Sequence, residues 1–358
     1  MPAYQLDNGK WVTAFYYRTH SGETKRKYKR SFDTEAEALA YEEHFKEMEG
    51  TPAQMTFREL AKSYLHDVKP RIRWSTYDTK ELMIRLKIVP FFGDKIVSEI
   101  TSLDIMRWQG WIDTLRQKNG KPYSATYIRQ LNSQVSAIFN FAERHYSIKP
   151  NPTRKVKKTG AQKSQEMQIW TREEYHAFLE AVSNKDMSFY AFELLYWTGI
   201  REGELLALTP SDFDFASQTL NINKAFAKRG KEDIIGPPKT KMGYRSITMS
   251  NFLAREFQEL FEREHIAPDE RIFKFTKSYL WREMERGCAK SGVKRIRVHD
   301  LRHSHVSMLI HMGFSAVAIG ARMGHESQDI TFRYAHLFPN EQENMANSLQ
   351  GIVTKARK

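Results

Sequence analysis

The first 50 residues contain two strand-like segments followed by one helical segment. Residues 11–18 (WVTAFYYR) and 25–32 (KRKYKRSF) each have strand-like composition, and the turn-forming sequence HSG at 20–22 lies between them, which predicts a β-hairpin. The residues from Asp33 to Gly50 favour one helix, with Asp33 or Thr34 as its N-cap. This pattern predicts a small domain over residues 1–50.

Residues 55–150 follow the periodicity of helices. A capping box of Thr56 and Glu59 predicts the start of the first helix. Three further helices are expected over about 75–89 with an end at Pro90, from Thr101 or Ser102 to near Gly120, and from Ser124 to before Pro150. The segment therefore predicts an all-helical domain.

Residues 151–168 lack apolar periodicity and carry Pro, Gly and basic residues, which predicts a basic linker. Beyond it, helical patterns (from the N-cap Thr171, over 188–198, and from Phe252 onward) surround strand-like segments at 219–228 and 244–250. We predict a multidomain α+β protein. Its third domain, over 169–340, is mainly helical with a small antiparallel sheet, and a tail helix follows over 341–358.

The charge balance favours a polyanionic partner. The chain has 56 Lys and Arg against 43 Asp and Glu, which leaves a formal charge of +13 and points to nucleic acid before an anionic membrane. No apolar run approaches the roughly 18 residues that span a bilayer, and residues 1–10 lack the apolar core of a signal peptide. The single cysteine, Cys288, excludes an internal disulfide and a thiolate metal cluster. We therefore expect an intracellular protein.

Basic residues gather in the predicted hairpin and in the predicted linker. A β-ribbon can enter a DNA groove, and linker cations can bind the phosphate backbone without sequence preference. A solvated basic face is the alternative for the hairpin. The candidate DNA-binding residues are Arg18, Lys25, Arg26, Lys27, Lys29 and Arg30 in the hairpin, and Arg154, Lys155, Lys157 and Lys158 in the linker.

Cations and hydroxyl groups concentrate in the last 160 residues. Arg201 occurs in TGIREGE, and HDLRH places His299 and Arg302 on one face of a helix. MGH then supplies His325, and RYAH supplies Tyr334 nine residues later. Each motif alone has an ordinary structural explanation.

A zinc site is an alternative interpretation of the histidines in HDLRHSH, because His299 and His303 are four residues apart and His305 follows. No carboxylate or cysteine at ligand spacing completes such a site. A histidine satisfied within a core is the stronger alternative, and we predict no metal.

The order TGIREGE, KT, HDLRH, MGH and RYAH resembles the tyrosine recombinase family over about residues 170–345. The upstream order is similar to the integrases of phages and integrative elements, in which an arm-type DNA-binding domain and a helical core-type DNA-binding domain precede a linker. Met323 stands where the family usually has leucine, a change that conserves volume.

The resemblance implies a role for each matching residue. Tyr334 would be the nucleophile, and Arg201 and Arg302 would hold the non-bridging oxygens of the scissile phosphate. His299 and His325 would complete the pocket, and Glu204 would support Arg201. Lys239, with Lys241 as a near alternative, would lie on a β-hairpin and protonate the leaving 5′ oxygen.

The chemistry of phosphodiester cleavage supports these roles independently. Guanidinium groups bind two oxygens at once and keep their charge at all useful pH values. A free tyrosine has a pKa of about 10, so its attack requires a base or a strongly positive pocket. A phosphotyrosine ester conserves the broken bond, which agrees with the absence of a GxxxxGK[ST] loop. We expect no cofactor.

We therefore expect an integrase that cleaves and rejoins double-stranded DNA through a 3′-phosphotyrosine and a Holliday junction. It would act as a homotetramer at crossover and arm sites in the bacterial cytoplasm, with an accessory excision or DNA-bending protein as a further candidate partner. The tail over 341–358 would pack on a neighbouring protomer, or on its own domain. The alternatives are a non-catalytic sequence-specific DNA-binding protein, a dimer resolvase, or an enzyme that relaxes supercoils.

Overall fold

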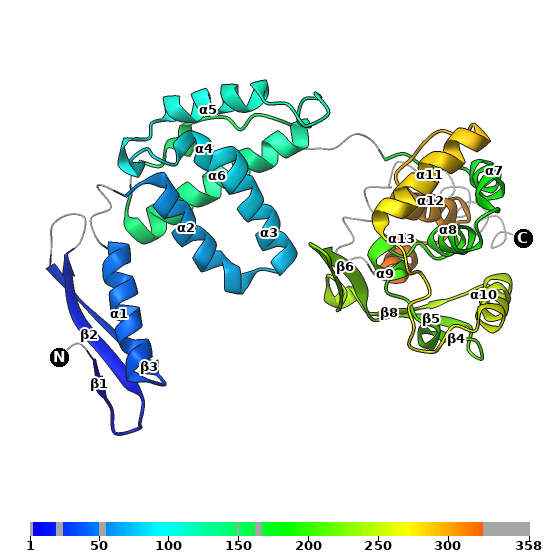
Figure 1. Ribbon diagram of the computed structural model, residues 1–358, viewed down its shortest axis with the longest axis horizontal. Coiled ribbons are helices and arrows are strands. Elements are labelled where there is room, and N and C mark those ends of the chain that lie inside the picture. Colours follow the sequence, from blue (N-terminus) through cyan, green and yellow to red (C-terminus); the bar gives the residue numbers. More distant parts are fainter. Residues whose placement is uncertain (1–2, 19–23, 50–54, 149, 162–166, 325–358) are drawn as a thin grey trace, which may run out of the picture. The chain divides into compact units, whose positions relative to one another are not determined.

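The computed structural model describes residues 3–18, 24–49, 55–148, 150–161 and 167–324, and it separates into two units at residues 165 and 166 (Figure 1). Within the described residues, none of the helices combines the length and the apolar character needed to span a membrane.

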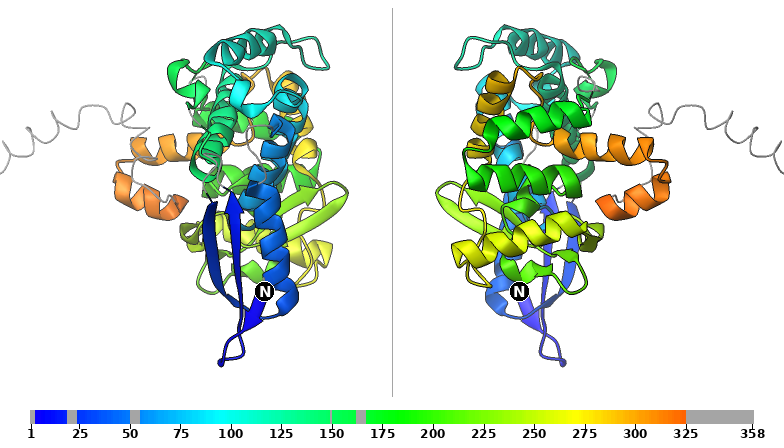
Figure 2. Two further views of the ribbon diagram at one scale, coloured as in Figure 1. Left: turned by 90° about the vertical axis from the view of Figure 1, so that its left-hand side faces the viewer. Right: turned by 90° about the vertical axis from the view of Figure 1, so that its right-hand side faces the viewer.

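The N-terminal part of the first unit is a three-stranded sheet with one helix along it (Figures 1 and 2). The strands are antiparallel in the order β1 (Ala3–Gln5), β2 (Trp11–Arg18) and β3 (Thr24–Phe32). The helix α1 (Glu35–Glu49) packs on one face. The predicted hairpin and helix are confirmed. Strand β1 was not predicted, because three residues give too little alternation to recognise.

The two faces of this sheet differ in what they contact. On the helix face, the Thr13 hydroxyl donates to Glu42 over 3.2 Å, and the rings of Phe15 and Phe45 lie 5.3 Å apart. The other face carries Tyr16, which is 67% exposed, and Tyr28. Since strand residues alternate between faces, the basic residues of β3 are divided between the two faces as well.

The second part of the first unit is helical. The chain forms α2 (Phe57–Val68), α3 (Trp74–Met83), α4 (Val89–Phe92), α5 (Ser102–Thr114) and α6 (Ala125–Tyr146), with 3₁₀ turns at Lys69–Arg71, Val97–Glu99 and Pro152–Lys155. The capping box of Thr56 and Glu59 and the N-caps Thr101 and Ser124 are present as predicted. Large apolar side chains such as Phe57, Trp108 and Phe139 fill the core.

Two predicted helix ends in this part are wrong. The helical path continues past Pro90, because a π-helical turn (Ile84–Ile88) separates α3 from α4 and Pro90 falls in the first turn of α4. A proline is tolerated at that position because its missing N–H has no helical partner there. Helix α5 ends at Thr114 rather than near Gly120, since Gln117–Gly120 form a turn closed by the N–H of Gly120 on the carbonyl of Gln117.

The first part of the predicted linker is fixed to the helical domain. Gln109 donates to the Lys157 carbonyl over 3.1 Å, and Arg129 donates to the Lys158 carbonyl over 2.7 Å. Asn132, which is 4% exposed, donates to the Thr159 hydroxyl over 3.0 Å. Residues 151–159 therefore belong structurally to the helical bundle.

The second unit has helices on one side and a small sheet with α10 on the other (Figure 1). Its helices are α7 (Arg172–Val182), α8 (Asp186–Thr198), α9 (Glu202–Leu205), α10 (Asn251–Glu264), α11 (Lys277–Ser291), α12 (Asp300–His311) and α13 (Ala316–Met323). The N-cap Thr171 is confirmed by a capping box with Glu174. A buried core that includes Phe178, Phe192 and Phe257 joins these helices to the sheet.

The described strands of this unit form two separate antiparallel sheets. One sheet has the order β4 (Phe213–Asp214), β5 (Thr219–Ile222) and β8 (Arg245–Thr248), and a hairpin joins β6 (Ala225–Arg229) to β7 (Glu232–Gly236). The predicted strand over 219–228 is thus two strands. Two 3₁₀ turns, Pro210–Asp212 and Lys241–Gly243, lie beside them. The predicted tail helix over 341–358 lies outside the described residues.

Candidate functional site

A sharp turn at the end of α8 positions Arg201. Gly199 ends this helix with φ +65°, a left-handed conformation, and a Cβ there would lie 2.7 Å from Cδ2 of His305. Glycine is therefore the residue that the turn accommodates. Two residues later the backbone of Arg201 serves as the N-cap of α9, and its side chain is 31% exposed.

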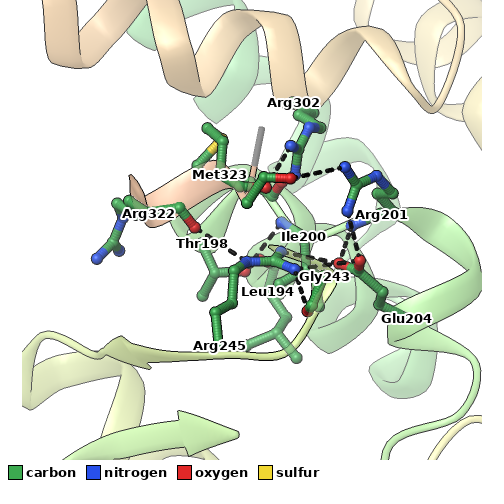
Figure 3. Close-up of polar contacts among 12 residues, drawn as sticks. Leu194, Thr198, Ile200, Arg201, Glu204, Gly243, Arg245, Arg302, Arg322 and Met323 are labelled. Carbon is green, nitrogen blue, oxygen red and sulfur yellow. Dashed lines mark hydrogen bonds and ion pairs between the residues drawn. The ribbon is translucent and has the colours of Figure 1, made fainter. Parts of the chain in front are cut away.

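The buried carboxylate of Glu204 fixes the position of Arg201. The carboxylate accepts from Nη1 of Arg201 over 2.7 Å and from its backbone N–H over 2.9 Å (Figure 3). The Glu204 side chain is only 3% exposed. A buried carboxylate that receives charge-assisted hydrogen bonds fixes the direction of the guanidinium.

Arg302 enters the same place from α12. Its residue is 4% exposed, and its Nη1 donates to the carbonyl of Gly199 over 2.7 Å. Its Nη2 donates to the carbonyl of Met323 over 2.6 Å, at the end of α13. Arg201 reaches the next carbonyl, that of Gly324, through Nη2 over 3.2 Å. The two arginines predicted to act as a pair therefore meet at the end of α13.

A third arginine, Arg245 of β8, completes this cluster, and no sequence motif predicted its role. Its Nη2 donates to Oε2 of Glu204 over 2.8 Å, and its Nη1 donates to Oε1 over 3.1 Å. Its Nε donates to the carbonyl of Arg322 over 3.0 Å (Figure 3). Three successive carbonyls at the end of α13 thus accept from three different arginines.

The position of α13 explains this arrangement. The last carbonyls of a helix lack helical partners and carry the negative end of its dipole, so guanidinium groups stabilise them. Gly324 closes the helix with φ +63°, and a Cβ there would lie 2.4 Å from the carbonyl oxygen of Met242. The glycine of the MGH motif is therefore required for the contact between α13 and the loop before β8.

The site is strongly positive. Burial alone would raise the pKa of Glu204, but hydrogen bonds and the charge of Arg245, followed by Arg201, outweigh it and lower the pKa. The carboxylate is consequently ionised at neutral pH. Its single negative charge meets the guanidinium groups of Arg201 and Arg245, and Arg302 adds a third positive charge to the site. Such a pocket suits an anionic group bound at Arg201.

His299 lies at the N-cap of α12, three residues before Arg302, and part of its surface is open to solvent. Neighbouring groups cover the rest of the side chain, and this partial loss of solvation lowers the pKa of His299; the charge of Arg302 adds to the effect. The ring of His303 lies 5.1 Å from that of His299, and burial lowers the pKa of His303 to about 4. Both rings are therefore neutral at pH 7, and a neutral imidazole can accept a proton.

Lys239 lies outside the β6–β7 hairpin, which corrects the predicted placement on a β-hairpin. β7 ends at Gly236, and both Lys239 and Lys241 are exposed in the connection from β7 to β8. The connection departs from a hairpin because β8 pairs with β5 instead of β7. Its end is fixed by Arg245, whose Nη1 donates to the Gly243 carbonyl over 3.1 Å.

Two predicted site residues, His325 and Tyr334, lie outside the described residues. The site described above consists of Arg201, Glu204, Arg302 and His299, with Arg245 added by the structure. His305, part of the alternative zinc reading, accepts from Nε of Arg322 through its Nε2 over 3.2 Å. Within the described ranges, no three His, Cys, Asp or Glu side chains could hold a metal ion together.

The candidate DNA-binding residues of the N-terminal domain fall on two faces. Arg26 lies 5.9 Å from the centre of the Tyr16 ring, and Arg30 lies 4.9 Å from that of Tyr28, on the open face. Lys27 and Lys29 instead lie over Phe45 and Tyr41 of α1. Arg18 is the last residue of β2, and Lys25 is the second residue of β3.

The linker candidates are held on the helical domain. Arg154 is exposed and pairs with Glu143 over 2.5 Å, and Lys155 and Lys157 are also exposed. Lys158 is half-buried and donates to the Ser133 hydroxyl over 3.4 Å. The backbone that carries these four basic residues is therefore held in place on the helical domain.

Three family profiles match successive parts of the chain. Residues 3–48 match the arm DNA-binding domain, residues 56–110 match the phage integrase N-terminal SAM-like domain, and residues 168–341 match the phage integrase family. These matches follow the chain in the order in which the structure places the sheet domain, the helical domain and the second unit.

Among curated proteins, the chain is similar to the ICEBs1 integrase of Bacillus subtilis, with 27% identity over 335 residues that cover 89% of each chain. It is also similar to the integrase of Mycobacterium phage D29, with 24% identity, covering 86% of this chain and 82% of the relative.

Solved structures show the same fold. The Tn1549 transposon integrase in complex with a circular intermediate DNA has a TM-score of 0.64 and 19% identity, covering 78% of this chain and 94% of that one. A lambda integrase tetramer bound to a Holliday junction has a TM-score of 0.59 and 19% identity, covering 93% and 94%.

Proposed function

We propose that the chain is a tyrosine recombinase, an integrase that inserts or excises a mobile DNA element by site-specific recombination. The observation that carries this function is the arginine pocket. Arg201 and Arg302 meet on adjacent carbonyls at the end of α13, and Glu204 holds the more exposed Arg201. Preorganised cations aimed at developing phosphate charge are usually the largest catalytic contribution.

In the proposed reaction, the phenol oxygen of Tyr334 attacks the scissile phosphorus and the 5′ oxygen leaves. The new phosphorus–oxygen bond gives a 3′-phosphotyrosine, and the proton from the phenol passes to a base. Lys239, or Lys241, supplies a proton to the departing 5′ oxygen. Attack by the 5′ hydroxyl of another strand reverses these steps and rejoins the DNA, and no nucleotide is consumed.

The described residues fit these tasks. Arg201 and Arg302 would bind the non-bridging oxygens, whose negative charge grows in the transition state. His299 is neutral at pH 7 because loss of solvation and Arg302 lower its pKa. It can therefore take part in proton transfer, and His325 would complete the pocket. Lys239 and Lys241 are exposed on a loop whose end Arg245 fixes.

The DNA arrangement follows from the domain order. We propose that the helical domain and the second unit bind crossover sites and that the N-terminal sheet binds separate arm sites. Arg154, Lys155, Lys157 and Lys158 would contact the phosphate backbone. Four protomers would act on two DNA sites through a Holliday junction, as the solved lambda tetramer is described. The tail over 341–358 would pack on a neighbouring protomer, and an accessory protein would set direction in the bacterial cytoplasm.

Cleavage is expected to proceed without a divalent metal, because arginine charge takes the place of metal ions in the proposed chemistry. Nicked DNA from the junction of the encoding element should become attached to the protein at the same rate in EDTA and in Mg²⁺. A nuclease of the two-metal type serves as the control for effective chelation. Strict dependence on added metal would contradict the mechanism.

The open face of the N-terminal sheet is expected to bind arm DNA. The double variant Arg26→Ala/Arg30→Ala should lower arm-site affinity by about 10-fold or more, since each lost phosphate or base contact weakens binding. The matched control, Lys27→Ala/Lys29→Ala, removes equal charge from the same strand but from residues beside α1. Competition footprinting measures both, and equal losses would refute the assignment of the face.

A further inference from the structure

We propose that Arg245 is a positioning residue that holds the arginine pocket, the lysine loop and the end of α13 in one arrangement. The proposal rests on the proposed function, because it concerns the catalytic geometry of Arg201. Arg245 lies in β8, and no sequence motif assigned it a role. Its side chain is 6% exposed, so it acts through its neighbours rather than on DNA.

The first neighbour is Glu204. Arg245 binds both carboxylate oxygens, with Nη2 to Oε2 at 2.8 Å and Nη1 to Oε1 at 3.1 Å. The same carboxylate accepts from Nη1 and the backbone N–H of Arg201. Because Glu204 is buried between the two arginines, removing Arg245 frees it to rotate, and the guanidinium of Arg201 loses its fixed direction.

The second and third neighbours are backbone carbonyls of two further elements. Nη1 donates to Gly243 over 3.1 Å, at the end of the loop that carries Lys239 and Lys241. Nε donates to Arg322 over 3.0 Å, in the last turn of α13. The next two carbonyls of that turn bind Arg302 and Arg201. One guanidinium therefore joins three elements of the site.

The position of α13 matters for the nucleophile as well. The chain continues from Gly324 directly into the segment that contains His325 and Tyr334. The loop and α13 touch closely, since a Cβ on Gly324 would lie 2.4 Å from the Met242 carbonyl. Arg245 thus fixes the end of α13, which directly precedes the segment of His325 and Tyr334 in the sequence.

Only a planar group with several hydrogen-bond donors can bind the Glu204 carboxylate and the two backbone carbonyls at the same time. Lysine carries its charge on one ammonium nitrogen and lacks the fork of a guanidinium. Arg245→Lys should therefore preserve the charge and much of the stability, while the orientation of Arg201 is lost. This separates a positioning role from a purely electrostatic one.

A double-mutant cycle on the full-length protein tests the proposal. The cleavage rates of the wild type, Arg245→Gln, Arg201→Ala and the double variant are measured on nicked junction DNA at saturating protein. Arg245→Gln alone should slow cleavage by about 30-fold, the scale of a small displacement of a catalytic group. In the Arg201→Ala background the same change should slow cleavage less than about threefold, because the residue it positions is gone. A gel shift should show unchanged DNA binding.

The matched control is Arg286→Gln. Glu283 is likewise a buried carboxylate between two cations of this unit, Lys185 and Arg286. Arg286→Gln should lower the melting temperature by less, because the Arg286 side chain is 31% exposed, and it should leave cleavage within about twofold of the wild type. If Arg245→Gln does not fold, Arg245→Lys replaces it, with slower cleavage at normal melting temperature as the expected result.

The outcomes distinguish two failures. If Arg201→Ala cleaves as fast as the wild type, the proposed role of Arg201 is wrong, and the role of Arg245 falls with it. If Arg201→Ala cleaves slowly but Arg245→Gln lowers the cleavage rate by the same factor with and without Arg201→Ala, only the positioning proposal is overturned. Full cleavage by Arg245→Lys or Arg245→Gln would also overturn it.

Discussion

Replacing Arg302 by alanine is expected to abolish DNA cleavage while leaving the gel shift on the same DNA nearly intact. The guanidinium would stabilise charge on the scissile phosphate, and losing one such donor costs about a hundredfold to a thousandfold in rate. Binding depends on many other cations along the chain, so its loss should be small. Single-turnover cleavage and a titrated gel shift measure the two quantities separately.

A structural loss must be separated from this chemical loss. Arg302 donates to the carbonyls of Gly199 and Met323, so its removal should also destabilise the fold by about 1–3 kcal/mol. Arg271→Ala is the control, because Arg271 donates to the carbonyls of Leu206 and Phe273 in the same unit. The control should lose stability and keep most of its cleavage. Equal loss of binding and cleavage by Arg302→Ala would contradict a mainly catalytic role.

Removing the carboxylate of Glu204 is expected to cause the largest loss of stability among the site variants. Glu204→Ala leaves Arg245 buried without its ionic partner, and breaking a buried pair in this way typically costs about 3–5 kcal/mol. Urea denaturation measures the free energy of unfolding. Glu204→Gln keeps the volume and should remain folded at lower temperature, where its cleavage rate can be compared with that of the wild type.

The pH dependence has a definite sign. The folded pKa of Glu204 is lowered from its ordinary value of 4.5 by Arg245 and Arg201, against the opposing effect of burial. Its stabilising contribution is therefore complete above pH 4.5 and is lost as pH falls through the folded pKa below that value. Glu204→Gln should reduce the loss of stability below pH 4.5.

Glu283→Ala provides the comparison for Glu204→Ala. Glu283 pairs with Lys185 and Arg286, and its pKa is also lowered because these cations outweigh burial. Both variants should be less stable. Glu204→Gln should also lose cleavage at a temperature where it is folded, whereas Glu283→Gln should keep it. Normal cleavage by folded Glu204→Gln would show that Arg201 does not depend on this carboxylate.

Local signals account for most of the elements predicted from the sequence. The capping boxes that begin at Thr56 and Thr171 mark helix starts that the structure confirms. These signals depend on contacts within one turn, and the sequence displays both partners. The end at Pro90 was wrong because a π-helical turn, which has no comparable local signature, places the proline in a first turn.

Long-range contacts explain what the sequence did not predict in the site. Arg245 lies 41 positions from Glu204 and 77 from Arg322. Its alternation within β8 is that of an ordinary strand residue, and only folding reveals its partners. Arg201 and Arg302 could be identified because each lies in a recognisable motif, TGIRE and HDLRH. The family resemblance implied a β-hairpin at Lys239, and no sequence signal indicated that β8 pairs with β5 instead.

The most direct test of the proposed recombinase activity is covalent trapping by the wild type and by Tyr334→Phe. Nicked DNA from the junction of the encoding element is mixed with each protein and run on a denaturing gel. The proposed mechanism predicts a shifted protein–DNA band for the wild type alone, which would establish the reaction class and the nucleophile together. A band with both proteins would assign the nucleophile to another residue. No band with either, on DNA that is bound and independently shown to be the correct site, would contradict catalysis and favour a non-catalytic DNA-binding protein.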